Sequence, residues 1–222
     1  MQLSTCDFVP ATGTPADRAC SPRSVNVDTV QGWAQLYEPD VNLVVYERDP
    51  GASLRQACEE LANSDFSERR VLVELGKTGC ALLTDLFLGQ DAIALDLLQL
   101  CEAFGDLVGA RALGLRIIRQ LAPTCPAFHV DRILARAVTA YAGSGSQWLE
   151  ERHVDRSALR RNQGESHRTP MHGGAPIQTI PSMHVALMKG EAWPGNSGRG
   201  LIHRSPPASD RPRVLVTIDP LD

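Results

Sequence analysis

The sequence lacks the features that mark several large classes of protein. Its six cysteines form no CxxC pair, so neither a zinc ribbon nor a redox dithiol is indicated. No apolar run reaches the length of a membrane span, and no positively charged segment followed by an apolar run stands near the start, as it would in a signal peptide. We therefore expect a cytoplasmic protein with no membrane partner.

Several activity signatures are missing as well. The chain contains no G-x-S-x-G nucleophile elbow, no phosphate-binding P-loop and no dinucleotide fingerprint. Its basic residues form no stripe with interleaved aromatic side chains, so we expect no nucleic-acid partner. Nucleophilic hydrolases and nucleotide-dependent enzymes are therefore poor interpretations of this chain.

The composition is that of a globular protein. The chain has 222 residues, of which 43% are hydrophobic and 22% are charged, so disorder, collagen and coiled coil are not indicated. Residues 1–110 hold 7 Lys/Arg and 17 Asp/Glu, whereas residues 111–222 hold 15 and 9. The basic C-terminal half can attract an anion or complement the acidic half within one fold.

The pattern along the chain predicts an α+β fold in one domain. Residues 1–28 are predicted to be a loosely ordered arm, and residues 29–222 a single domain with a polar loop at about 150–181. Apolar periodicity predicts helices that begin near Ser53 and Asp91. Short β-branched or alternating runs predict strands at 41–46, 115–121, 133–141, 183–188, 200–203 and 213–218. Helices followed by short strands with Gly/Pro turns favour a β-sandwich or barrel-like core.

The first candidate for chemistry is the tripeptide His129-Val-Asp131. Residues i and i+2 of an extended segment share a face, so this imidazole and carboxylate point the same way. With a distant histidine they would complete the two-His-one-carboxylate triad that holds Fe(II) and leaves positions open. A second such tripeptide, His153-Val-Asp155, stands among charged residues and is interpreted as solvated surface.

The second candidate joins His203 and Arg213. His203 ends a short apolar run, and Arg213 opens the next predicted strand ten residues later. If those strands pair, His203 can be the third metal ligand and the guanidinium can bind a carboxylate through two hydrogen bonds. Tyr141, at the end of a predicted strand, is a further candidate for hydrogen bonding to a co-substrate, and Arg136 is predicted to face away from the metal.

These residues resemble those of known families. The order His129-x-Asp131, His203, Arg213 is similar to that of the Fe(II)/2-oxoglutarate dioxygenases, most of all the phytanoyl-CoA-hydroxylase type. A closer resemblance covers about residues 30–220, to an uncharacterised bacterial family often encoded beside metal-chaperone GTPases of the zinc-starvation response. That closer resemblance rests on Cys125-Pro-Ala-Phe-His-Val-Asp-Arg132, Tyr141-x-Gly-x-Gly-x-x-Trp148, Lys189-Gly-Glu191 and His203-Arg-Ser-Pro206.

The resemblance implies both a fold and an activity. The fold would be a double-stranded β-helix, jelly-roll or cupin-like, with the N-terminal helices packed on it. Fe(II) would lie on His129, Asp131 and His203, and Arg213 would bind 2-oxoglutarate, in a hydroxylase of unknown small-molecule or protein substrate. Leu215 stands where many dioxygenases carry Ser or Thr. A metal-chaperone GTPase would be a partner.

Two alternatives remain open at this point. The same His129, Asp131 and His203 could bind Zn(II) in a non-catalytic protein of metal homeostasis, since zinc accepts nitrogen and oxygen ligands. Arg213 distinguishes the two interpretations, because a metal store needs no buried arginine aimed at a dicarboxylate. The other alternative is a structural barrel without a metal.

Overall fold

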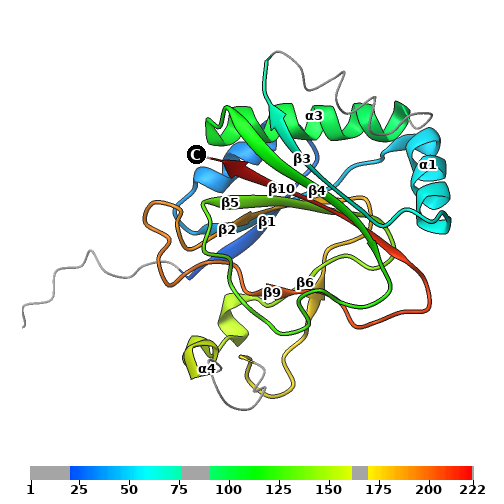
Figure 1. Cartoon of the computed structure of the whole chain (residues 1–222). Coiled ribbons are helices and arrows are strands. Elements are labelled where there is room, and N and C mark those ends of the chain that lie inside the picture. Colours follow the sequence, from blue (N-terminus) through cyan, green and yellow to red (C-terminus); the bar gives the residue numbers. More distant parts are fainter. Residues whose placement is uncertain (1–20, 77–90, 162–169, 222) are drawn as a thin grey trace, which may run out of the picture.

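Two β-sheets and a layer of helices make up the protein. The computed structural model describes residues 21–76, 91–161 and 170–221 (Figure 1). The larger sheet has the order β1-β2-β8-β5-β10-β4-β3, and the smaller sheet has the order β7-β6-β9. The larger sheet comprises β1 (Arg23–Val27), β2 (Val41–Tyr46), β3 (Glu68–Glu74), β4 (Ala112–Gln120), β5 (Ala135–Ala142), β8 (Val185–Lys189) and β10 (Arg213–Leu221); the smaller comprises β6 (Gln147–Trp148), β7 (Gln178–Thr179) and β9 (His203–Arg204).

The chain winds back and forth between the two sheets. After β4 in the larger sheet it reaches His129, whose backbone pairs with β9 of the smaller sheet, and it then returns to the larger sheet as β5. It visits the smaller sheet as β6 and β7, the larger as β8, the smaller as β9, and ends in the larger as β10. This winding is that of a double-stranded β-helix, so the predicted α+β fold class is confirmed.

Helices cover the outer face of the larger sheet. Figure 1 shows α1 (Gly51–Asn63) and α3 (Asp91–Val108) on one side of this sheet, with β6 and β9 on the other. A 3₁₀ helix, η1 (Val30–Tyr37), joins the same layer. In α1, Leu54, Cys58 and Leu61 form one buried stripe, as a period of 3.6 residues requires. Both predicted helices are therefore confirmed.

The inner face of the larger sheet carries a second apolar cluster and, beside it, the candidate site. Strand β10 shows the alternation that separates the two faces. Val214 and Val216 belong to the core under the helices, whereas Leu215 packs between the sheets. The cluster between the sheets contains Leu43, Val45, Val138, Ile180, Ala186, Met188, Leu201 and Leu215.

The structure differs from the prediction in several places: β3 (Glu68–Glu74) was not predicted, and the strand predicted at 200–203 is formed only at His203–Arg204. The predicted arm does not extend over Arg23–Val27, which forms the edge strand β1 parallel to β2; Val25 and Val27 pack against the core. Residues 1–20 of that arm lie outside the described residues. The predicted polar loop contains η2 (Glu151–His153), α4 (Arg156–Arg161) and β7, while residues 162–169 lie outside the described part.

In the described part of the chain, no helix combines the length and the apolar character that crossing a membrane would require.

Candidate metal centre

His129 and His203 face each other across an isolated antiparallel bridge. The backbone N–H of each residue donates to the carbonyl oxygen of the other, and both N···O distances are 3.0 Å. Directly opposite residues in such a bridge carry their side chains on the same face. The two imidazole rings accordingly lie 4.5 Å apart, centroid to centroid. A bridge between segments far apart in sequence therefore brings the two histidines together.

Both imidazoles are oriented by their Nδ1 atoms. In His129, Nδ1 lies 3.0 Å from the carbonyl oxygen of Ala127, and in His203 it lies 3.1 Å from that of Leu201. A carbonyl oxygen only accepts, so Nδ1 carries the proton in each ring and Nε2 keeps its lone pair. Metal-binding histidines are held in their ligating tautomer by this kind of contact.

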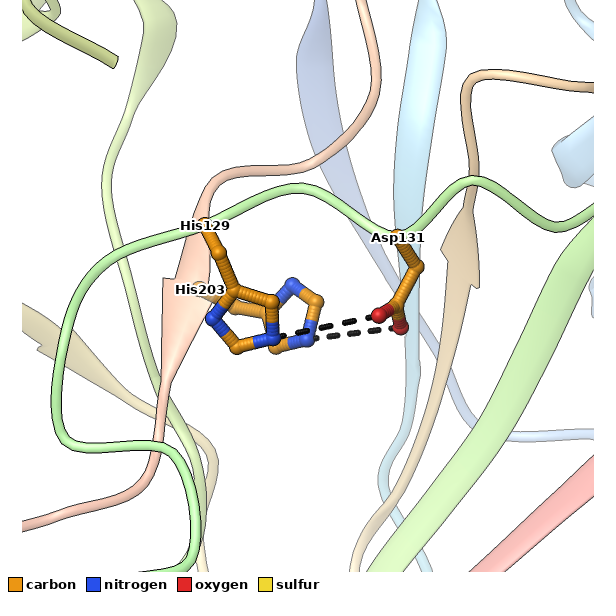
Figure 2. Close-up of side chains that lie close together, drawn as sticks. All are labelled: His129, Asp131 and His203. Atoms are coloured by element: carbon orange, nitrogen blue, oxygen red, sulfur yellow. Dashed lines mark ion pairs between the residues drawn. The ribbon is translucent and has the colours of Figure 1, made fainter. Parts of the chain in front are cut away.

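Asp131 completes the set. Its Oδ1 lies 3.8 Å from Nε2 of His129, and its Oδ2 lies 3.5 Å from Nε2 of His203. Figure 2 shows both rings directed at this carboxylate, and the ligand atoms of the three residues lie within 4.8 Å of one another. With bonds of about 2.1 Å, neighbouring ligands of one ion lie about 3.0 to 3.4 Å apart. The donor set therefore fits a divalent metal with only small adjustments.

Burial keeps His203 in its neutral form. Burial lowers the pKa of this imidazole to about 4, although the neighbouring Asp131 carboxylate acts in the opposite direction. A neutral imidazole presents a lone pair rather than a proton at Nε2. His203 is thus ready to act as a ligand near neutral pH.

Arg136 lies inside the site, contrary to the prediction that it faces away. Its Nη1 donates to Oδ2 of Asp131 at 2.8 Å. Its Nε and Nη2 donate to the two carboxylate oxygens of Asp219, both at 2.7 Å. Arg136 and Asp219 stand on the neighbouring strands β5 and β10 and point into the same space. The guanidinium therefore connects the candidate ligand Asp131 to β10.

The backbone around Asp131 is held by a turn that follows β8. Glu191 donates its N–H to the carbonyl oxygen of Asp131 at 2.9 Å, and Gly190 donates to that of Leu134 at 3.0 Å. A Cβ atom on Gly190 would lie 2.0 Å from the carbonyl oxygen of Ile133. Only glycine permits so close an approach, so this turn fixes the path of the segment that carries Asp131.

A cavity of about 440 Å³ lies beside the three residues. Both His129 and His203 line it. Its other polar lining includes Arg70, Arg116, Thr124, Cys125, Arg136, Ser146, Arg204, Ser205, Thr217 and Asp219, and its apolar lining includes Leu72, Val138, Met188, Leu215 and Leu221. Four arginines face this space. Asp219 is the acidic residue of the lining, so the cavity wall is predominantly basic.

Arg213 is buried at the start of β10. It does not line this cavity itself, but it contacts a residue that does. Its Nε donates to the carbonyl oxygen of Ser144 at 2.8 Å, and its Nη2 donates to the hydroxyl of Ser146 at 3.0 Å. Ser146 lines the cavity, whereas Arg213 lines a separate space of about 20 Å³. Within the described ranges, Nη1 of Arg213 has no hydrogen-bond partner. Burial lowers the pKa of this guanidinium to about 10.

Tyr141 lies on the other face of the larger sheet. Its hydroxyl donates to Oδ2 of Asp96 on α3 at 2.5 Å, and Asp96 also accepts two hydrogen bonds from Arg48. Burial, followed by the charge of Asp96, raises the pKa of Tyr141 well above its ordinary value. The structure thus does not bring Tyr141 together with His129 and His203. A bulge in the pairing of β5 and β10 lies beside this position.

The second tripeptide stays outside the site. His153 belongs to η2, and its Nε2 accepts from the neighbouring Arg152 at 3.1 Å. Among the described residues, the group with metal-ligand spacing is His129, Asp131 and His203. Sequence reasoning missed the pair Arg136 and Asp219. It also missed Arg70 on β3 and Arg116 on β4, which line the same cavity.

Among the solved structures compared with this chain, one supports the fold, and two further matches have lower TM-scores. A protein of Shewanella oneidensis, provisionally named an oxygenase, matches with a TM-score of 0.51 and 10% identity over 90% of this chain and 89% of its own. The dioxygenase for auxin oxidation 1 of Arabidopsis thaliana, solved with 2-oxoglutarate, gives a TM-score of 0.48 and 10% identity over 90% and 92%. The rice dioxygenase for auxin oxidation gives 0.49 and 12% over 90% and 83%. Likeness at such identity concerns the fold alone.

Sequence comparison places the chain in a family. No curated protein sequence matches it. The model of one family, described as protein of unknown function (DUF1826), matches residues 28–219, which is most of the chain. This span includes the histidine bridge, the Asp131 segment and nearly all of β10. The chain belongs to the DUF1826 family.

Proposed function

We propose that the protein is an Fe(II)- and 2-oxoglutarate-dependent oxygenase that hydroxylates its substrate. The observation that carries this proposal is the convergence of His129, Asp131 and His203, with both Nδ1 atoms tied to carbonyl oxygens. Two imidazoles and one carboxylate with open positions are the ligand set of non-haem Fe(II) oxygenases. Fe(II) with 2-oxoglutarate and oxygen supplies the oxidising power for hydroxylating a C–H bond.

The chain's own residues would position the reactants and exclude water. His129 and His203 both line the cavity, so a metal held by them would have room beside it for further ligands, as a catalytic metal requires. Val138, Met188 and Leu215 give that space apolar walls. An apolar enclosure protects a reactive centre from water and side reactions.

Arg213 supports the co-substrate part of the proposal. Arg213 is only 7% exposed, and its guanidinium forms no ion pair with an acid in the described part of the chain. Gln120 stands opposite it on β4, and both polar atoms of that side chain lack partners among the described residues. A buried charge without a partner is unfavourable, so the site would gain from an anion. We assign the far carboxylate of 2-oxoglutarate to Arg213, with Ser146 between it and the cavity.

Open coordination also bears on the Zn(II) alternative. A structural zinc site is closed by four protein ligands. The described residues provide three ligands here, beside a cavity large enough for a small molecule. This favours an oxygenase over a metal store. The GTPase partner and a role in zinc homeostasis stay predictions.

The test is an anaerobic titration of Fe(II)-loaded protein with 2-oxoglutarate. We expect a visible metal-to-ligand charge-transfer band in the unaltered chain. His203→Ala should lose stoichiometric Fe(II) binding, whereas the matched variant His153→Ala should keep it. Arg213→Ala should keep the metal and weaken 2-oxoglutarate about tenfold or more, because it removes a charge-assisted hydrogen-bond donor.

Two results would contradict the proposal. Stoichiometric Fe(II) binding by both His129→Ala and His203→Ala would exclude the assigned ligands. A metal-loaded protein that shows no band and no heat of binding with 2-oxoglutarate would exclude the co-substrate and favour the Zn(II) alternative.

A further inference from the structure

Two arginines face each other across strands on the far wall of the cavity. Arg70 on β3 stands directly opposite Arg116 on β4, and both line the cavity. The Nε atoms of both donate to the same oxygen of Glu68, at 2.5 and 2.8 Å. Arg116, followed by Arg70, holds the pKa of the Glu68 carboxyl below its ordinary value. A single carboxylate, that of Glu68, therefore forms ion pairs with two guanidinium groups.

This wall keeps an unbalanced positive charge. Like charges directly opposite each other on neighbouring strands are destabilising. Glu68 neutralises one of the two, and in the part of the chain described here the Nη atoms of Arg70 and Arg116 have no hydrogen-bond partner. Each guanidinium thus offers free donors in the fork geometry that fits a carboxylate or a phosphate.

The charge of the whole cavity points the same way. Arg136 is outnumbered by its two partners Asp131 and Asp219, whereas Arg70 and Arg116 share the single carboxylate Glu68, so the charges of these two groups cancel. Arg204 adds another positive charge, hydrogen-bonded to Gln147 and stacked 4.3 Å from the Phe128 ring centroid. A divalent metal would add two further positive charges, and the two negative charges of 2-oxoglutarate would offset only part of the summed positive charge. The filled site would still favour an anion.

An apolar strip lies beside the arginine pair. Leu72 on β3 and Leu221 on β10 line the cavity together and are 54% and 43% exposed. Between them lies Gly114, whose added Cβ would just touch Leu221 at 3.6 Å. The wall is therefore open and apolar next to its positive charge. Further in, Val138 and Met188 extend the apolar surface.

We propose that Arg70 and Arg116 bind an oxyanion, a carboxylate or a phosphate, on an otherwise apolar primary substrate. The oxyanion lies at the β3–β4 wall, and the apolar part runs along the inner face toward His129 and His203. From strand and residue spacings, the Cα atoms of Arg116 and Arg136 lie about 12 Å apart, which suits a small molecule. Naming this ligand the substrate rests on the proposed function; the anion site itself does not.

The experiment measures binding of three eight-carbon probes by calorimetry. Octanoate and octyl phosphate carry the oxyanion on an apolar chain, and octan-1-ol carries the chain alone. Each is titrated into the metal-free full chain, and then into chain loaded with Zn(II) and 2-oxoglutarate. The double variant carries both Arg70→Gln and Arg116→Gln. The control variant is Arg69→Gln, which changes the neighbouring arginine on the opposite face of β3.

The supporting result is specific. At least one anionic probe binds the unaltered chain and the control, binds the double variant about tenfold or more weakly, and outcompetes octan-1-ol. The preferred probe then identifies carboxylate or phosphate as the substrate group. Metal and 2-oxoglutarate affinities, and the urea midpoint, stay unchanged in the double variant.

Three results would overturn the inference. The first is equal anion affinity in the double variant and in the control, and the second is that neither anion binds the unaltered chain. The third is that the double variant loses affinity for 2-oxoglutarate and keeps its affinity for the probe. The last would assign the pair to the co-substrate. Failure of the proposed function looks different, since the anions would still bind the metal-free chain while Fe(II) or 2-oxoglutarate would not.

Discussion

Arg136 makes three hydrogen bonds, one to a candidate metal ligand and two to a second carboxylate. It donates to Oδ2 of Asp131 and makes two further hydrogen bonds to Asp219. A ligand carboxylate that is fixed by a neighbour needs little rearrangement when the metal arrives. We regard Arg136 as a positioning residue, because it acts through Asp131.

Replacing Arg136 by methionine tests this role. Arg136→Met keeps an apolar stem but removes the donor to Asp131, and we expect Fe(II) or Zn(II) affinity to fall about tenfold to hundredfold. Competition with a chelating indicator measures this affinity. Arg132→Met is the control, since Arg132 is an exposed arginine in the same segment. Equal metal affinity in the two variants would show that Asp131 needs no support from Arg136.

At the scale of single residues, sequence patterns predicted the three residues that the structure brings together, but not their surroundings. His129 and Asp131 could be predicted because two-residue spacing in an extended segment keeps them on one face. The same parity rule failed for Arg136, five residues after Asp131, because bends at 133–134 interrupt the extended chain. Asp219 could not be paired with Arg136 in advance, since strand register between β5 and β10 depends on tertiary contacts.

Among the elements, the turn after β8 acts on the site without contacting a metal. Gly190 lies against the backbone of Ile133, and the Glu191 side chain accepts the N–H groups of Gly198 and Gly200 at 2.5 and 3.0 Å. The turn is thereby tied to its own loop on one side and to the Asp131 segment on the other. The position of Asp131 thus depends on a turn distant in sequence.

Gly190→Ala should disturb both stability and metal binding. The new Cβ would meet the Ile133 carbonyl oxygen at 2.0 Å, and overpacking of this kind lowers the free energy of unfolding by about 1–3 kcal/mol. Urea unfolding and a metal titration measure the two effects. Gly173→Ala is a matched control, because a Cβ there would meet no atom within 4 Å. If Gly190→Ala behaves like the control, the turn does not constrain the segment.

Both helices and most of the longer strands could be predicted from sequence, but β3 (Glu68–Glu74) was not, because its charged residues obscure the alternation, and the short strands were harder. Apolar periodicity predicted α1 and α3, and β-branched runs predicted β2, β4 and β10. Strand β6 spans Gln147–Trp148 and β7 spans Gln178–Thr179, lengths too short for any alternation. Such strands exist because the larger sheet and the winding of the chain hold them together. Strand β1 was missed because five residues with two valines give a weak pattern.

Across the whole molecule, burial divides the described cysteines into two chemical types. Cys58 on α1 and Cys101 on α3 lie in the core under the helices, and burial raises the pKa of both thiols to about 12. Cys125 is exposed and lines the cavity. The thiolate is the reactive form of cysteine. The two buried thiols are therefore unreactive for two reasons: reagents cannot reach them, and they stay protonated.

Alkylation followed by peptide mapping tests this division. In the folded protein, iodoacetamide should modify Cys125 but leave Cys58 and Cys101 intact from pH 7 to 9.5; in urea all three should react. Because the folded pKa exceeds the ordinary thiol value of about 8.5, the stability contributed by the two thiols is fully present below that value. It declines as the pH rises toward 12. Modification of Cys58 at the rate of Cys125 would contradict the buried core.

The bridge between His129 and His203 has a consequence for how the protein is made. The candidate ligands His129 and Asp131 leave the ribosome well before His203, which lies 72 residues beyond Asp131 on a later strand. The bridge can close only after β9 has been synthesised and has paired. A metal ion would therefore be acquired only after β9 has emerged and paired. An ion bound there would link the first half of the barrel to the last and slow its reopening.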